Sequence, residues 1–217
     1  MKKYLLLIFA FSVVHVAYAQ PAVRNEPRHH NVFENDYVRV LDVYLAPNDT
    51  TQFHVHATPS VFITFTKTTT VSQLVGQSPV KSTSVAGMPW YDSLVTPRIH
   101  RVWNEDTTWF HVMDVELTGG TARTNEAALQ IDVLHLLFDE RLVRGYKAEL
   151  AAKQSLKFPS SKAGYLVIST GDASLTLQSG GSVQQRLMKA GHYCWLNEES
   201  TLSTNDTRAT LLVLQLK

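Results

Sequence analysis

Three histidines in the first half of the chain have the residue type and spacing of metal ligands. His54 and His56 are two residues apart in a strand-like segment, so their side chains project from one face and can share an ion. His100 lies further along the chain, where a neighbouring strand can bring it to the same ion. Neutral imidazole suits Fe, Mn, Ni, Zn and Cu. The pattern predicts one divalent transition metal ion here, with a packed or solvated histidine pair as the alternative.

The composition narrows the chemistry and the partners. Cys194 is the single cysteine, so the chain can form neither an internal disulfide nor a thiolate zinc site, and nitrogen and oxygen must hold any metal. The 20 basic and 19 acidic side chains give a formal charge of +1, which leaves no electrostatic surplus for a phosphate backbone or an anionic membrane. The expected partner is a small-molecule ligand, and no nucleic acid is expected.

Short strands must position these side chains. The alternation of polar and apolar residues, with glycine and proline turns between, predicts strands over residues 37–45, 61–66, 109–117, 164–169, 173–178, 182–188 and 208–216. Residues 126–138 fit a helix, but a strand over 130–137 fits nearly as well, so this stretch stays open. Many short strands with regular turns predict an all-β sandwich or small barrel.

The two halves of the chain resemble each other. Residues 33–64 align without a gap on residues 138–169, at a constant offset of 105. The seven identical pairs are Phe33 and Phe138, Val38 and Val143, Arg39 and Arg144, Leu45 and Leu150, Ala46 and Ala151, Phe53 and Phe158, and Ile63 and Ile168. A repeat of this length indicates two tandem domains, because solenoid units run roughly 20 to 50 residues.

The motifs of the first half resemble those of the cupin superfamily. Cupins carry His-x-His in a first motif and His-x-x-x-Asn in a second, and this sequence has His54-Val55-His56 and then His100 followed by Asn104. The resemblance covers essentially the whole mature chain when both repeats are counted. It implies two tandem cupin (double-stranded β-helix, or jelly-roll) barrels, a bicupin whose N-terminal barrel carries degenerate metal motifs.

One departure from the cupin pattern concerns the metal ligands. Where the family places a metal-binding glutamate, residues 57–61 contain no carboxylate. The resemblance then implies a neutral set of three histidines, as in cupins that hold ferrous iron and activate dioxygen, with an anionic substrate supplying charge. In the second half, His54 and His56 fall on Pro159 and Ser161 at the same offset, so no metal site is expected there.

Other residues are predicted near the site. Arg98 and Arg101 flank the third histidine and can hold a carboxylate, and Tyr91 can donate a hydrogen bond to a bound ligand. Gln52 and His111 are candidates to join or support the metal site, although a structural role is favoured for both. No general acid or base stands out near the motifs. A dioxygenase or isomerase of a small oxygenated molecule is therefore weighed against a non-catalytic ligand-binding or structural cupin.

The first residues indicate export. Lys2 and Lys3 precede an apolar run over 5–16, and Ala17 and Ala19 are the small residues that a signal peptidase reads. A periplasmic or secreted protein with no membrane contact after cleavage is expected, and a homodimer is left open. The predicted organisation is signal peptide 1–19, N-terminal arm 20–32 with His29 and His30, first barrel 33–117, connector 118–137 and second barrel 138–217.

Overall fold

The protein is almost entirely β-structure, as its sequence predicts. The computed structural model describes residues 20–119 and 126–217, and within these ranges it has eighteen strands and one short 3-10 helix, η1 (Val23–Asn25). The predicted signal peptide lies outside the described residues. No helix in these ranges has the length and hydropathy that crossing a bilayer requires.

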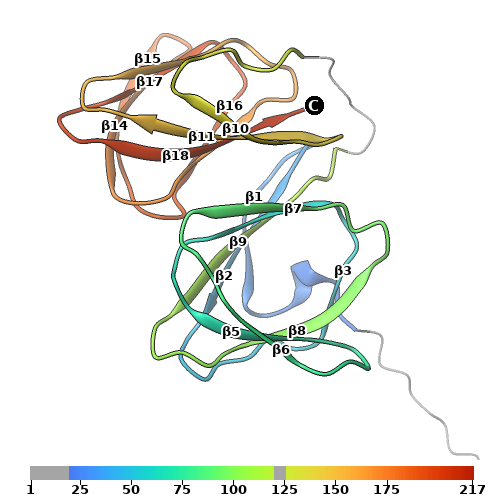
Figure 1. Ribbon diagram of the computed structural model, residues 1–217. Coiled ribbons are helices and arrows are strands. Elements are labelled where there is room, and N and C mark those ends of the chain that lie inside the picture. The colour runs from blue at the N-terminus through green and yellow to red at the C-terminus, as the bar shows by residue number, and fades with distance from the viewer. Residues whose placement is uncertain (1–19, 120–125) are drawn as a thin grey trace, which may run out of the picture.

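Nine strands form the N-terminal barrel, which is coloured blue to green in Figure 1. They are β1 (His29–Glu34), β2 (Arg39–Leu45), β3 (His54–His56), β4 (Ser60–Thr64), β5 (Thr69–Leu74), β6 (Val80–Thr83), β7 (Met88–Asp92), β8 (Arg98–Asn104) and β9 (Phe110–Glu116). They make two sheets, in the orders β1-β2-β9-β4-β7 and β3-β8-β5-β6. Side chains alternate between the barrel interior and its outside along each strand.

Nine further strands form the C-terminal barrel, coloured yellow to red. They are β10 (Leu134–Asp139), β11 (Val143–Leu150), β12 (Ser155–Phe158), β13 (Tyr165–Ser169), β14 (Ala173–Ser179), β15 (Ser182–Met188), β16 (Tyr193–Leu196), β17 (Ser200–Thr204) and β18 (Ala209–Leu216). Their sheet orders, β10-β11-β18-β13-β16 and β12-β17-β14-β15, repeat those of the first barrel strand for strand. The predicted pair of tandem barrels is confirmed.

The first strand of each barrel begins earlier than its sequence pattern indicates. β1 begins at His29, within the predicted arm, and β10 begins at Leu134, within the predicted connector. The stretch 126–138, which fitted a helix or a strand, forms no helix: it enters β10 after a coil segment. The repeat therefore extends further toward the N-terminus than residues 33 and 138.

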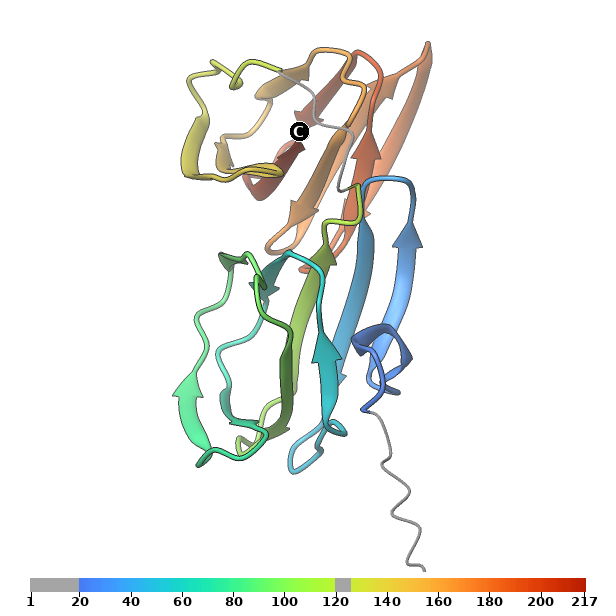
Figure 2. The same cartoon turned by 90° about the vertical axis from the view of Figure 1, so that its right-hand side faces the viewer.

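The two barrels are joined through their five-stranded sheets. The outward face of one sheet presents Val40, Ile63 and Val115, and the facing sheet presents Leu166 and Leu214, all buried in one core. Figures 1 and 2 show the two barrels one above the other, so that this contact lies between the blue-to-green barrel and the yellow-to-red barrel. Both faces of each five-stranded sheet are thus covered, one by its own barrel interior and one by the other barrel.

The interiors of the two barrels differ although their topology is the same. Apolar side chains, including Tyr146, Phe158 and Tyr165, fill the C-terminal barrel. Among the described residues, the apolar cluster inside the N-terminal barrel is small and surrounds Leu45 and Phe110, and the barrel encloses a cavity of about 620 Å³. The filled barrel supplies packing, and the hollow one has room for a ligand.

The shared core between the barrels is testable by truncating one of its side chains. We expect Leu214→Ala, which removes a fully buried side chain from this core, to lower the free energy of unfolding by about 2 to 5 kcal/mol in urea titrations. The control is Leu187→Ala, because Leu187 is 82 % exposed and its truncation should change stability by about 0.5 kcal/mol or less. Equal effects of the two variants would contradict a core shared between the barrels.

Candidate metal centre

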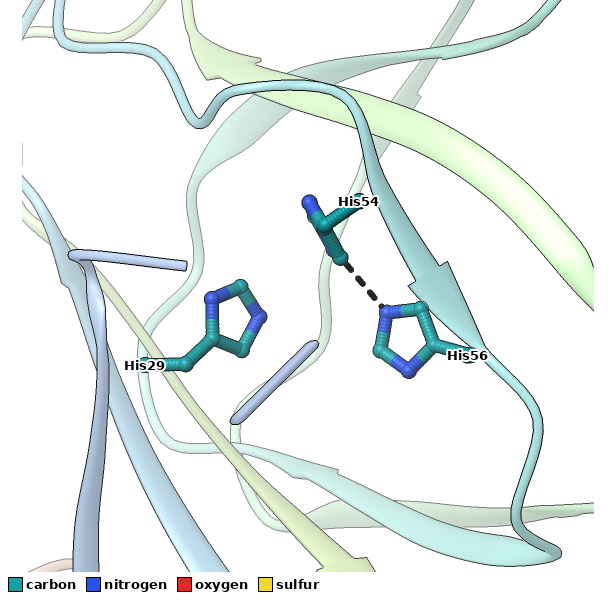
Figure 3. A group of neighbouring side chains, drawn as sticks. All are labelled: His29, His54 and His56. Carbon is teal, nitrogen blue, oxygen red and sulfur yellow. Dashed lines mark hydrogen bonds between the residues drawn. The ribbon is translucent and has the colours of Figure 1, made fainter. Parts of the chain in front are cut away.

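Three buried or half-buried histidines meet inside the N-terminal barrel. His54 and His56 lie on β3 with 1 % and 2 % of their surface exposed, and their Nε2 atoms are 3.0 Å apart. The ring of His29 faces them from β1 (Figure 3). One nitrogen from each of these three rings lies within 4.8 Å of the other two. Spacing of this kind permits all three to bind one metal ion.

His100, the third predicted ligand, lies at the edge of the same cluster. It is paired with His54 across β3 and β8, so the two side chains project from the same face of the sheet. Its ring centroid is 4.8 Å from that of His54 and 4.9 Å from that of His56. Its Nδ1 lies 3.1 Å from the Ser72 hydroxyl. The structure therefore brings His54, His56 and His100 together and adds His29.

Hydrogen bonds at Nδ1 direct the other ring nitrogen of two histidines toward the cluster. The Gln52 carbonyl lies 2.8 Å from His54 Nδ1, and the Glu26 carboxylate lies 2.7 Å from His29 Nδ1. Both partners only accept, so each Nδ1 carries a proton, and Nε2 is the atom of each ring that can bind a metal ion. Metal-binding histidines in proteins are oriented in this way by the groups behind them.

Two buried carboxylates lie behind the imidazoles. Glu26 and Asp114 are each 1 % exposed. Asp114 on β9 is 3.3 Å from His56 Nδ1, and neither of its oxygens has a hydrogen-bond partner among the described residues. In the filled barrel the corresponding β18 residue, by strand pairing, is Val213. Carboxylates are thus supplied from elsewhere in the fold, by Glu26 in the segment before β1 and by Asp114 on β9, one layer behind the histidines.

Burial keeps two of the histidines neutral. Desolvation, assisted by the neighbouring histidines, lowers the pKa of His54 to about 4 and that of His100 to about 2. Burial by itself raises the pKa of Glu26, but hydrogen bonds from His29 and from the backbone N–H groups of Gln52 and Arg28 outweigh it and lower the pKa. Neutral nitrogen donors in front of buried carboxylates fit a divalent cation, whose charge the carboxylates offset.

His29 is the site residue that sequence reasoning missed. It lies in the predicted polar arm, outside both cupin motifs. The internal repeat contains the signal that finds it: His29 pairs with Val43 in the first barrel as Leu134 pairs with Ala148 in the second. If the repeat is extended by four residues toward the N-terminus at the same offset of 105, His29 falls on Leu134. Leu134 lies in a strand and packs against the core of the second barrel, so His29 is expected in a strand as well.

Of the predicted ligand-binding residues, Arg98 lines the cavity. Arg101 lies on the opposite face of β8, over the rings of Phe53 and Trp103. Tyr91 packs against the core between the barrels and does not line the cavity. Strand alternation explains the difference, because Arg98 and His100 share one face and Arg101 takes the other.

The two supporting candidates also lie outside the ring cluster. The side chain of Gln52 is exposed, and only its backbone serves the site. His111 is buried on the outer face of β9, where its Nε2 is 2.7 Å from Asp42 and its ring stacks on Tyr44. Asn104, the last residue of the second motif, donates to the carbonyl of Leu45 and shapes a turn.

The second barrel shows what replaces the histidines. His54 is paired with His100, and the same positions of the second barrel are Phe158 and Ser200. The counterpart of His54 is therefore Phe158, one residue before the Pro159 that the constant offset selects. An aromatic side chain fills the space that the imidazoles occupy in the first barrel.

Comparison with known proteins finds this fold in solved structures. No family model and no curated protein sequence matches the chain. A "Cupin 2 conserved barrel domain protein" from Leptotrichia buccalis is similar over 87 % of this chain and 88 % of its own, with a TM-score of 0.56 and 11 % identity. A variant of salicylate 1,2-dioxygenase from Pseudoaminobacter salicylatoxidans in complex with gentisate is similar over 89 % and 75 %, with a TM-score of 0.61 and 10 % identity. The protein YhaK from Escherichia coli is similar over 86 % and 90 %, with a TM-score of 0.53 and 12 % identity.

The comparison supports the fold of the chain, and the histidine cluster lies within that fold. The chain has the fold of two cupin barrels in tandem, and three histidines gather in the N-terminal one. At these identities the likeness to solved structures is a likeness of fold. Metal and activity therefore have to be argued from the site.

The neutral histidines make stability depend on pH. Unfolded, His54 and His100 titrate near 6.5, whereas burial lowers their pKa values to about 4 and about 2. As the pH falls below 6.5, the unfolded chain takes up protons that the folded chain refuses, so stability is lost toward acid. We expect the Tm of metal-free protein to decrease from pH 6.5 to 5, and to decrease less in His100→Phe. His30→Phe, at an exposed position, should keep the wild-type slope, and equal slopes in both variants would contradict the assignment.

Proposed function

We propose that the N-terminal barrel binds one divalent transition metal ion, and that the protein is an oxygenase that acts on a small, partly aromatic ligand. The observation that carries the proposal is the burial of two carboxylates, Glu26 and Asp114, behind a cluster of imidazoles. Charges buried in this way are unfavourable unless an opposite charge lies beside them. A divalent cation among the imidazoles supplies that charge.

The ligands of the ion come from three strands. His54 and His56 hold it from β3, His29 approaches from β1, and His100 completes the surroundings from β8. A set of imidazoles suits iron, manganese, nickel, zinc or copper. When bound, a redox-active metal of this kind supplies the chemistry of dioxygen activation. The protein orients the imidazole rings, because hydrogen-bonding groups behind them hold their Nδ1 atoms.

The cavity next to the cluster fits a flat ligand with an oxygen substituent. Phe62 and Trp90 stack on each other with centroids 5.2 Å apart, and both line the cavity. The Arg98 guanidinium lies over Phe62, 5.5 Å from the ring centroid. Asp92 holds Arg98 in place at 2.5 Å, while Arg98 Nε is buried without a hydrogen-bond partner. The exposed part of the guanidinium, which lines the cavity, can bind a ligand oxygen.

The reaction class follows from what the cavity lacks. An isomerase moves protons and needs a free general acid or base. Among the described residues that line the cavity, Asp114 is the one carboxylate, and it is buried beside the Nδ1 atom of His56. An oxygenase requires no such group from the protein. The salicylate 1,2-dioxygenase with gentisate bound shares this fold, which supports an oxygenase acting on an aromatic acid.

The alternative is a cupin that binds its ligand without turnover. The apolar rim of the cavity favours it, because Val80, Val85 and Met88 are exposed there and would be covered by a bound molecule. The metal ion would then serve binding alone. The two functions differ in dioxygen consumption, which only the oxygenase shows.

Export to the periplasm or the exterior is part of the proposal. It is supported by the basic and apolar pattern of the first nineteen residues and by the state of the lone cysteine. Cys194 is buried, and desolvation raises the pKa of its thiol to about 11, so it resists oxidation in such a compartment. A homodimer stays a prediction.

Metal content tests the proposed site directly. Protein purified without an affinity tag, from cultures supplied with each of the five metals in turn, should contain close to one equivalent of transition metal. We expect His54→Ala to abolish this content, because it removes a central buried ligand. His192→Ala, at an exposed position in the second barrel, should leave it unchanged. Wild-type protein without metal under every supplement would end the proposal.

Dioxygen consumption tests the reaction and the ligand subsite. With iron-loaded protein and salicylate or gentisate as probes, we expect consumption of dioxygen. Arg98→Gln should raise KM about tenfold or more, the loss expected for one charge-assisted hydrogen bond, with metal content unchanged. Arg101→Gln is the matched control on the opposite face of β8. Binding without dioxygen consumption would favour the non-catalytic alternative, and equal KM values in the two variants would exclude the Arg98 subsite.

A further inference from the structure

The N-terminal segment, residues 20–28, is attached to the strand that carries two of the clustered histidines. The Pro21 carbonyl accepts a hydrogen bond from the Val55 N–H at 2.9 Å, and Ala22 forms a parallel bridge with Val55. Val55 lies between His54 and His56 on β3. The segment leads directly into β1, where His29 is the first residue. It therefore connects β3 to a third member of the cluster.

Glu26 is the centre of this attachment. One of its carboxylate oxygens accepts the Arg28 N–H at 2.8 Å and faces His29 Nδ1 at 2.7 Å. The other accepts the Gln52 N–H at 3.1 Å, and the Gln52 carbonyl accepts from His54 Nδ1 at 2.8 Å. A continuous chain of hydrogen bonds thus runs from His29 through Glu26 and the Gln52 backbone to His54. The orientation of one ring is coupled to the docking of the segment.

The corresponding segment of the second barrel is held differently. Residues 126–133 precede β10 as residues 20–28 precede β1, and their side chains Leu129, Ile131 and Val133 pack against the apolar core. In the N-terminal segment the buried apolar side chain is Val23. Its other attachments are polar, among them an ion pair from Arg28 to Asp49 at 2.7 Å. Segments with few buried apolar contacts open at low free-energy cost.

We propose that the N-terminal segment is a metal-dependent closure of the barrel, in which Glu26 is the positioning residue that aims His29 at the ion. The inference rests on the proposed metal site and adds to it a coupling between metal binding and segment docking. A ligand that binds only the docked state stabilises docking, and docking in turn raises affinity for that ligand by the same factor. Loss of Glu26 removes a charge and three accepted hydrogen bonds, one of which holds His29 Nδ1 in place.

Hydrogen exchange with Co²⁺ as the probe tests this coupling in the purified protein. We expect Co²⁺ to slow amide exchange about tenfold or more over residues 20–34 and at the Gln52 and Val55 amides, which donate to the segment. Exchange in β18, far from the site in the core between the barrels, should not change and reports that each variant is folded.

Matched variants separate the coupling from the metal site itself. His29→Ala should still bind Co²⁺, with a lower affinity because one ligand is lost, and should lose the protection of residues 20–34. Glu26→Gln should weaken binding by about 10- to 100-fold and reduce the protection, because Gln cannot replace both acceptor oxygens. His30→Ala, at the exposed neighbouring position, should behave like the wild-type protein.

The possible failures are distinguishable. If Co²⁺ binds, His54→Ala abolishes binding, and His29→Ala keeps the protection seen in His30→Ala, the coupling is wrong and the metal site stands. Protection of residues 20–34 that is independent of Co²⁺ would overturn the coupling in the same way. If the wild-type protein takes up no Co²⁺, the metal site and the closure fall together.

Discussion

A buried carboxylate needs either hydrogen-bond donors or a positive charge, and in the N-terminal barrel Asp114 has no hydrogen-bond partner among the described residues. The imidazole beside it, His56, belongs to a cluster in which burial lowers the pKa values of His54 and His100. Glu26 adds a second buried negative charge on the other side of that cluster. One cation bound in this cluster would account for the hollow interior, the placement of four histidines and the docked N-terminal segment.

The duplication shows how one topology serves two purposes. The strand orders of the barrels are the same, yet Phe158 and Val213 stand in the second barrel where His54 and Asp114 stand in the first. Apolar filling gives the second barrel a core of its own and a rigid sheet for the first to pack against. The first barrel can then give up its interior to polar groups and a cavity, which by itself would cost stability.

Much of the fold and part of the site could be predicted from the sequence. Period-two alternation and turns located most strands, and the internal repeat indicated two barrels. Alternation also places Arg98 on the face of His100 and Arg101 on the other, although both had been assigned to the ligand. Tyr91 was harder to place, because both faces of its sheet carry apolar residues. One face lines the barrel interior, and the other, which carries Tyr91, packs between the barrels.

The sequence by itself determined which residues form strands, which side chains share a face, and that His54 and His56 act as a pair. These properties depend on neighbours a few positions away, so a local pattern carries them. Only the tertiary structure decided that His29 and Glu26 close the cluster and that Asp114 stands behind it. Those contacts join segments 25 to 58 residues apart in sequence, and strand pairing and sheet packing, which no local pattern records, bring them together.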